Sequence, residues 1–142
     1  MITYDLSKFI TAHREDFDTA LHEIRAGHKQ SHWMWYIFPQ IQGLGRSSTA
    51  QYYAIHDLDE AAAFLDDPYL GGNLIEICQA LLQLHTCDAT SVMGTPDDLK
   101  LRSSMTLFSL VPDAPPVFSD VLEKYYDSIP DHMTIEIIDG MQ

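Results

Sequence analysis

The chain has 142 residues, of which 46% are hydrophobic and 20% are charged, and its net charge is −13. This length fits one globular domain spanning residues 1–142, and the composition excludes a disordered chain. A field this negative repels phosphate backbones and anionic lipid, so we expect neither nucleic-acid nor membrane binding.

Further features of the chain indicate a cytoplasmic protein. The N-terminus lacks a basic segment followed by a long apolar one, and the longest apolar run, Trp33–Pro39, is too short to span a bilayer. The chain has two cysteines, which suits reduced thiols, and we expect Cys78 to be a packing residue. No cofactor motif is recognisable, and the oligomeric state is left open.

The first predicted helix runs from Leu6 to about Arg25. Four apolar residues recur there at helical spacing, namely Phe17, Ala20, Leu21 and Ile24. Gly27 follows at the position where a helix-terminating glycine belongs.

The next segment, Ser31–Phe38, fits two structures. Its aromatic and β-branched content suits a strand, but little else in the chain offers that strand a partner. We therefore favour a short helix capped by Ser31 and ended by Pro39. Residues two apart point about 200° away from each other in a helix. We accordingly predict that Trp33 is buried against the first helix, whereas Trp35 borders a cavity.

Residues 40–84 contain a predicted loop and three predicted helices. Gln40–Arg46 is a glycine-punctuated loop, and a helix follows near Ser48–Ile55. Asp57 with Glu60 resembles a capping box for a helix that runs through Leu65. A turn is indicated by Pro68, Gly71 and Gly72. The segment Asn73–Leu84 is apolar on nearly all sides, which predicts the buried central helix.

Three more helices complete the prediction. One begins after Thr95-Pro96, with Asp97 and Asp98 at the positive end of its dipole. Another is Val117–Tyr126, which follows two prolines. Asp131–Ile138 is the last, although its residues 134–138 also suit a strand. The sequence thus predicts an all-α fold, a compact domain of about six to eight helices around a buried central helix.

Two segments, Lys29–Ser48 and Asp97–Phe108, carry residue types that a core alone does not require. They contain four of the eight basic residues, namely Lys29, Arg46, Lys100 and Arg102. An acidic protein that gathers its cations in two places can use them locally to bind an anion. The alternative is chance combined with the preference of cations for helix ends.

The helix after Pro96 presents two stripes. Leu101, Met105 and Phe108 form a core stripe, and the adjacent one is made of Lys100, Ser103, Ser104 and Leu107. The lysine and the two hydroxyls can bind an anion, and a desolvated Lys100 can activate Ser104 as a nucleophile. In the simpler alternative, both serines bond back to helix carbonyls and the lysine stays solvated.

The loop Gly43-Leu44-Gly45-Arg46 is a candidate anion site. Glycines let backbone amides turn toward an anion, the following helix N-terminus adds positive potential, and Arg46 offers a fork for phosphate or carboxylate. An ordinary tight turn is the alternative reading.

The histidine beside the two tryptophans is a second candidate. If burial keeps its imidazole neutral, His32 can donate or accept a proton; the alternative is a core histidine bonded to a carbonyl. His28 and His32 lie four residues apart but lack a third ligand, so we predict no metal site.

Two motifs closely resemble those of the bacterial domain of unknown function 1810 family. The first is Lys29–Gln40, KQSHWMWYIFPQ, followed by Gly43-Leu44-Gly45, and the second is Lys100–Phe108, KLRSSMTLF. The resemblance covers nearly the whole chain and implies a single all-helical domain. It implies no established activity, cofactor or catalytic residue. Some members carry the label calpastatin, but the chain has no feature of a protease inhibitor.

The chain departs from the family's pattern in three places. His13 stands where a glutamine is usual, and Asn73 stands where an arginine often occurs. Ser128-Ile129-Pro130 replaces a glycine-containing turn before Asp131. The change at Asn73 weakens any anion site that needs an arginine there.

Two functions are expected from these observations. The first is a small-molecule site, with or without hydrolase or transferase activity, for an anionic or nucleotide-like ligand. Its catalytic candidates are His32, Lys100 and Ser104, and its binding candidates are Trp35, Gly43, Gly45, Arg46 and Ser103. It predicts a concave pocket where these side chains meet. The alternative is a non-catalytic interaction or adaptor domain, in which the aromatic motif is only core and an apolar patch is exposed.

Overall fold

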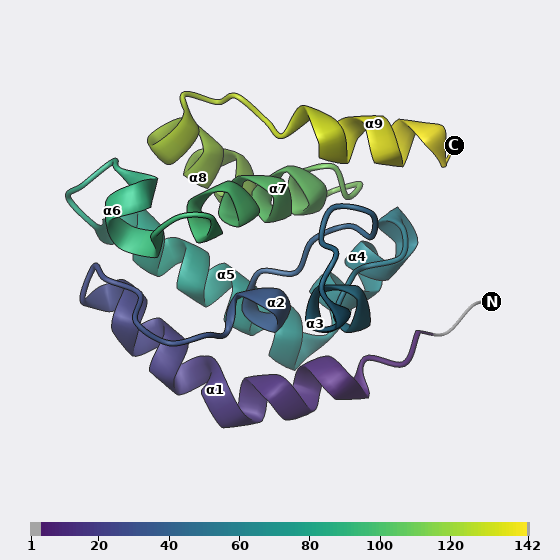
Figure 1. The fold of residues 1–142 in the computed structure, drawn as a ribbon, viewed down its shortest axis with the longest axis horizontal. Helices are drawn as coiled ribbons and strands as arrows, with labels where there is room; N and C mark the ends of the chain where they lie inside the picture. The colour runs from purple at the N-terminus through teal and green to yellow at the C-terminus, as the bar shows by residue number, and fades with distance from the viewer. Residues whose placement is uncertain (1–3, 142) are drawn as a thin grey trace.

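The structure, a computed structural model, describes residues 4–141 and contains nine α-helices within that range (Figure 1). They are α1 (Ser7–Arg25), α2 (Met34–Ile37), α3 (Ser48–Tyr52), α4 (Leu58–Asp66), α5 (Pro68–Gln83), α6 (Ala89–Met93), α7 (Asp97–Ser109), α8 (Val117–Tyr126) and α9 (His132–Gly140). The predicted all-α class is confirmed, including a helix at the C-terminal segment that also suited a strand. In the described part of the chain, no helix combines the length and apolar character needed to cross a bilayer.

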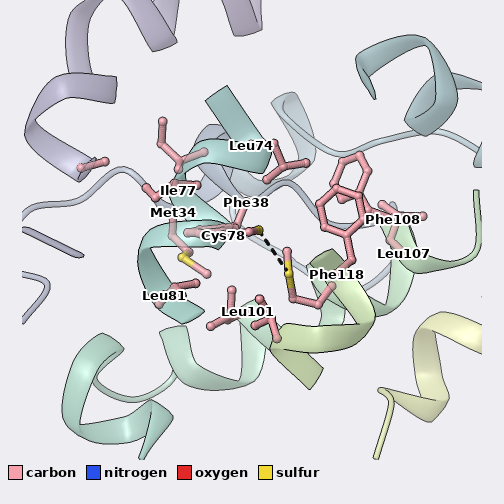
Figure 2. Packing of buried hydrophobic residues seen from close by; sticks show 14 of the residues in the cluster. Met34, Phe38, Leu74, Ile77, Cys78, Leu81, Leu101, Leu107, Phe108 and Phe118 are labelled. Atoms are coloured by element: carbon pink, nitrogen blue, oxygen red, sulfur yellow. Dashed lines mark hydrogen bonds between the residues drawn. The ribbon is translucent and has the colours of Figure 1, made fainter. Parts of the chain in front are cut away.

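Helix α5 lies at the centre of the arrangement, as predicted. It packs against α1, α4 and α8, while α7 packs against α6, α8 and α9. In Figure 1, α1 and α9 lie at opposite edges with α5 between them. Figure 2 shows where α5 meets α7: the Cys78 thiol points at the Met105 sulfur, 3.6 Å away. Burial raises the pKa of the Cys78 thiol, so this cysteine is an inert packing residue as expected.

The predicted turn before the central helix is wrong. Residues 68–72 form the first turns of α5, because Pro68 suits the first helical position and the Asp67 carboxylate accepts hydrogen bonds from the amides of Tyr69 and Leu70. Gly71 is needed for packing rather than for a turn. A Cβ atom on Gly71 would lie 2.1 Å from the Leu65 carbonyl oxygen, so glycine permits the close approach of the α4 C-terminus.

Other helix boundaries differ from the predictions in small ways. Ser31 does not cap α2, which begins three residues later with no side-chain cap. Helix α3 ends at Tyr52, because Ile55 leaves it to form an isolated parallel bridge with Ile41. The one-turn helix α6 is additional and is capped by Asp88.

Two predicted helix termini are confirmed in detail. Gly27 has a φ of 80°, and the amides of Gly27 and His28 bond to the last turn of α1, which is a glycine-terminated helix end. At the start of α4, the Asp57 side chain accepts from the Glu60 amide at 2.8 Å. The Glu60 carboxylate accepts from the His56 amide, one residue earlier than an ideal capping box requires.

Candidate functional site

The site begins with a buried glutamate near the end of α1. The Glu23 carboxylate accepts four hydrogen bonds: from the amides of Gln30 and Ser31, from the Ser31 hydroxyl, and from the Trp33 indole at 3.0 Å. Burial by itself raises the pKa of a carboxyl group, but these donors, led by the Ser31 hydroxyl, outweigh it and hold the pKa of Glu23 at about 2. Glu23 therefore fixes the chain that leads into α2.

A buried lysine ties this segment to α7. The Lys29 ammonium lies 2.8 Å from Asp97 Oδ2 and 4.8 Å from the centre of the Trp33 ring, and it also donates to the Ser31 carbonyl. Only 6% of the Lys29 side chain is exposed. We call Glu23, Lys29, Ser31 and Trp33 the Trp33 anchor. Its charged and polar groups all have partners, and Trp33 itself is 1% exposed, so the predicted core position of Trp33 against α1 is confirmed.

The other tryptophan lies in a different environment. Trp35 is half-buried, and the Lys100 ammonium lies 5.7 Å from the centre of its ring. Lys100 also faces the second oxygen of Asp97, at 3.6 Å, and 30% of its side chain is exposed. Two lysines thus share one aspartate. Of the two lysines, Lys100 is the one with donors free for a ligand.

Two hollows adjoin each other near Trp35, and Trp35 lines the smaller of them. The first has a volume of about 10 Å³, room for a single water, and is lined by Trp35, Gln40, Ile41, Gly45, Ala50, Tyr53 and Ala54. The second has a volume of about 440 Å³ and is lined by Gln42, Gly43, Gly45, Gln51 and Ala54. Gly45 and Ala54 belong to both. The prediction that one tryptophan is buried while the other borders a cavity is confirmed.

Backbone conformation explains one of the two loop glycines, and packing explains the other. Gly43 has a φ of 100°, a conformation that favours glycine. A Cβ atom on Gly45 would lie 2.5 Å from the Ala50 Cβ atom, so glycine lets the loop approach α3. Helix α3 has one turn, so its dipole adds little positive potential. The loop contributes to the site by forming, with Gly43 and Gly45, part of the wall of the larger hollow. Arg46 follows that wall, is exposed, and forms no ion pair within residues 4–141.

The structure brings Trp35, Gly43, Gly45 and Lys100 near one another, and Arg46 directly follows Gly45 in the chain. It does not bring Ser103 or Ser104 to this site. Ser104 is fully buried, and its hydroxyl has no hydrogen-bond partner in the described residues, so a substrate cannot reach it. The Ser103 hydroxyl donates to Asp131 and to the Leu99 carbonyl, which is the back-bonding alternative.

The predicted acid–base histidine is not in an aromatic pocket. His32 is exposed, and its imidazole forms no hydrogen bond or ion pair with Lys100 or Ser104 in the described part of the chain. The burial that the proton-transfer hypothesis requires is therefore absent at His32. Among residues 4–141, no three His, Cys, Asp or Glu side chains gather around a position suited to one metal ion.

Lys29, Ser31 and Trp33 of the Trp33 anchor come from the two motifs that carry the family resemblance, as do Trp35, Gly43, Gly45 and Lys100. The sequence model of the family described as "Protein of unknown function (DUF1810)" matches residues 3–138. The chain belongs to the DUF1810 family. A similar solved structure is that of the conserved hypothetical protein Rv1873 from Mycobacterium tuberculosis, which is 40% identical, has a TM-score of 0.93, and is matched over 96% of this chain and 97% of that one. Among proteins with curated descriptions, none matches.

Two of the departures from the DUF1810 pattern contact each other. The buried His13 ring donates from Nε2 to the Tyr36 carbonyl at 2.7 Å, so its Nδ1 accepts from the Asn73 amide at 3.1 Å. Asn73 lines neither hollow beside Trp35. The residue at position 73 therefore belongs to the contact between α1 and α5 and does not alter the composition of these hollows.

The third departure lies in the turn before α9. Asp127 and Ser128 both have positive φ values, 54° and 63°. Such values favour glycine, which explains why a glycine-containing turn is usual here.

Sequence reasoning missed Glu23 and the bridging role of Asp97. Glu23 lies at the edge of the apolar stripe of α1, and a charged residue at such an edge is a usable signal for a buried carboxylate. Asp97 was interpreted only as a favourable acid at a helix start. Its contact with Lys29 joins segments 68 positions apart, so no local pattern could have found it.

Proposed function

We propose that this chain binds a small anionic, nucleotide-like ligand at the Trp35 site, which we define as Trp35, Gly43, Gly45, Arg46 and Lys100. The observation that carries the proposal is the Lys100 ammonium held over the ring of Trp35, a side chain that also lines the smaller hollow at Gly45. An indole next to a cation with free donors suits a ligand that combines a flat ring with an oxyanion.

Charge supports an anion at this place. The chain carries 21 acidic and 8 basic residues, so most of its surface repels anions. The cations near Trp35 are the exception: Lys29 holds Asp97 at 2.8 Å, and Lys100 faces the same carboxylate only at 3.6 Å, so its donors remain available to an anion. Arg46 adds a second cation without a carboxylate partner in the described residues. A local positive field in an acidic protein favours one charged ligand over general polyanion binding.

The proposal is for binding rather than catalysis. The residues that line the two hollows include no histidine, cysteine, aspartate or glutamate. Histidine and carboxylate side chains are among the commonest general acids and bases, and none of them lines these hollows. The fully buried Ser104 does not supply a nucleophile there.

A thermal-shift screen tests the proposal with matched probes. We would compare AMP with adenosine, which lacks the phosphate, and with ribose 5-phosphate, which lacks the base, and extend the panel to other nucleotides and sugar phosphates at low salt. A ligand at a hundred times its Kd should add about 2.7 kcal/mol to the free energy of unfolding. We expect probes with both a ring and an oxyanion to stabilise the protein most.

Variants locate the effect. Lys100→Gln and Arg46→Gln should each weaken binding about tenfold, because each removes a charge-assisted hydrogen bond. Arg14→Gln is the matched control, since Arg14 is also an exposed arginine but lies on α1. If no compound in the panel stabilises the protein, or if Arg14→Gln weakens binding as much as Arg46→Gln, the site is rejected and the adaptor function is favoured instead.

A further inference from the structure

A cleft of about 610 Å³ lies between α6, α7 and α8, away from the Trp35 site. Its polar and aromatic lining includes Thr86, Asp88, Asp98, Arg102, Tyr125 and Tyr126. It shares no lining residue with the hollows beside Trp35. Lys100 and Arg102 are two apart on α7 and point about 200° away from each other, so the helix presents one cation to each site.

Arg102 is an unpaired cation in this cleft. Its guanidinium carbon lies 5.0 Å from the centre of the Tyr126 ring. Its Nε atom is buried without a hydrogen-bond partner, and no carboxylate lies within 4.0 Å of its nitrogens in the described part of the chain. A buried donor without an acceptor is costly. An oxyanion in the cleft would provide that acceptor and meet the planar fork of the guanidinium.

Most other polar groups of the cleft are already bonded within the protein. Tyr125 and Tyr126 donate to the carbonyls of Leu81 and Asp98. The Asp98 carboxylate accepts from the Thr90 hydroxyl at 2.6 Å and from the Leu99 amide. The tyrosines therefore offer a ligand their ring surfaces rather than their hydroxyl groups.

Asp88 is the exception. Its Oδ1 atom caps α6 by accepting from the amides of Thr90 and Ser91. Its Oδ2 atom has no such partner in the described residues, and the side chain is exposed at the cleft. The cleft thus combines one cation with free donors, one carboxylate oxygen with a free lone pair, and an aromatic wall.

We propose that this cleft binds a small zwitterion, an amino acid with an apolar or aromatic side chain, whose carboxylate pairs with Arg102 and whose ammonium pairs with Asp88. The two aspartates in the lining disfavour a doubly charged phosphate, because one arginine does not offset both. The volume suits a ligand of this size, and the Tyr125 and Tyr126 rings and Leu99 provide an apolar surface for its side chain.

The test measures binding of L-phenylalanine, L-tryptophan, L-leucine and L-methionine by following the backbone amide cross-peaks of the cleft residues in ¹⁵N–¹H spectra, which every variant retains, together with the Arg102 Nε–H cross-peak of the wild type. L-Phenylalanine is then compared with 3-phenylpropionate, which lacks the ammonium, and with 2-phenylethylamine, which lacks the carboxylate. We expect L-phenylalanine to bind at least about tenfold more tightly than either analogue, because each lacks one charge-assisted contact.

Conservative variants separate the two contacts. Arg102→Gln should weaken amino-acid binding about tenfold, and Arg102→Lys should restore part of it by keeping the charge. Asp88→Asn keeps an efficient helix cap and should remove the preference for L-phenylalanine over 3-phenylpropionate. Arg14→Gln, on α1 and outside the cleft, and Lys100→Gln, at the Trp35 site, should leave amino-acid binding unchanged.

Three results would overturn the proposal. One is that none of the four amino acids binds saturably below about 10 mM. Another is that 3-phenylpropionate or inorganic phosphate binds as tightly as L-phenylalanine. The third is that folded Arg102→Gln protein binds like the wild type. Because Lys100→Gln disables only the Trp35 site, failure here is distinguishable from failure of the proposed nucleotide site.

Discussion

Trp33 and Trp35 stand two residues apart in one motif, yet they lie in opposite environments. Trp33 is 1% exposed, and its indole N–H donates to Glu23. Lys29, which lies over its ring, pairs with Asp97 and donates to the Ser31 carbonyl. Trp35 is half-buried, and the lysine over it has one distant carboxylate. Polar groups whose hydrogen bonds are all made within the protein have a structural role, whereas polar groups with unused donors remain available to bind a ligand.

Alanine substitution of each tryptophan gives the largest expected contrast. Trp33→Ala should lower the free energy of unfolding by about 3–5 kcal/mol, because it empties a core position and removes one of the three donors to Glu23 Oε1. Trp35→Ala should cost clearly less. Urea unfolding of both variants measures this, and equal large losses would mean that the motif is only core.

The two lysines should differ in the same direction. Lys29→Met breaks a buried ion pair and should cost about 3 kcal/mol. Lys100→Met removes a partly exposed pair at 3.6 Å and should cost less than about 1 kcal/mol. Chemical denaturation of both variants makes the comparison, and an equal cost would break the distinction between anchor and site.

The pH dependence of stability tests Glu23. Its folded pKa of about 2 is below the ordinary value of 4.5, so the ionised carboxylate stabilises the fold above pH 4.5 and this stabilisation is lost as the pH falls toward 2. The shift corresponds to about 3 kcal/mol at neutral pH. Glu23→Gln should therefore be less stable than the wild type at pH 7, with a difference that shrinks on acidification. A difference independent of pH would contradict the assigned role.

A smaller pH effect is expected from His13, which ties α1 to α2 on the anchored side. Burial lowers the pKa of His13 below 6.5. Below pH 6.5 the unfolded chain takes up a proton that the folded chain resists, so stability falls on acidification. His13→Gln should remove this part of the decline between pH 7 and 5, as measured by thermal unfolding. An unchanged decline would show that another group causes it.

Much of the fold follows from local sequence patterns. The helical stripe of α1, the glycine after it, the Asp57 cap and the buried stripe of α7 all behave as their spacing predicts. The start of α5 was missed because Gly71 was interpreted as a turn residue. Its actual role depends on the Leu65 carbonyl, a tertiary contact that spacing does not encode.

The candidate site was predictable only in part. The different burial of the two tryptophans agrees with the prediction, but Trp33 precedes α2, so the helix geometry behind that prediction applies to Trp35 alone. Lys100 followed from the motif. The Lys29–Asp97–Lys100 bridge could not be predicted, because it joins segments distant in the chain. His32 and Ser104 were chosen for their chemistry, but burial decides which side chains a ligand can reach, and here it exposes the histidine and encloses the serine.

The most direct test of the account is ¹⁹F NMR of the protein labelled with 5-fluorotryptophan. The chain has two tryptophans, so the spectrum contains one resonance per indole, assigned with Trp35→Phe. We predict that AMP, or the best compound of the thermal-shift panel, shifts the Trp35 resonance saturably and leaves the Trp33 resonance in place, and that Lys100→Gln weakens this response. Equal shifts of both resonances, or no shift with any compound of the panel, would contradict a binding site at Trp35.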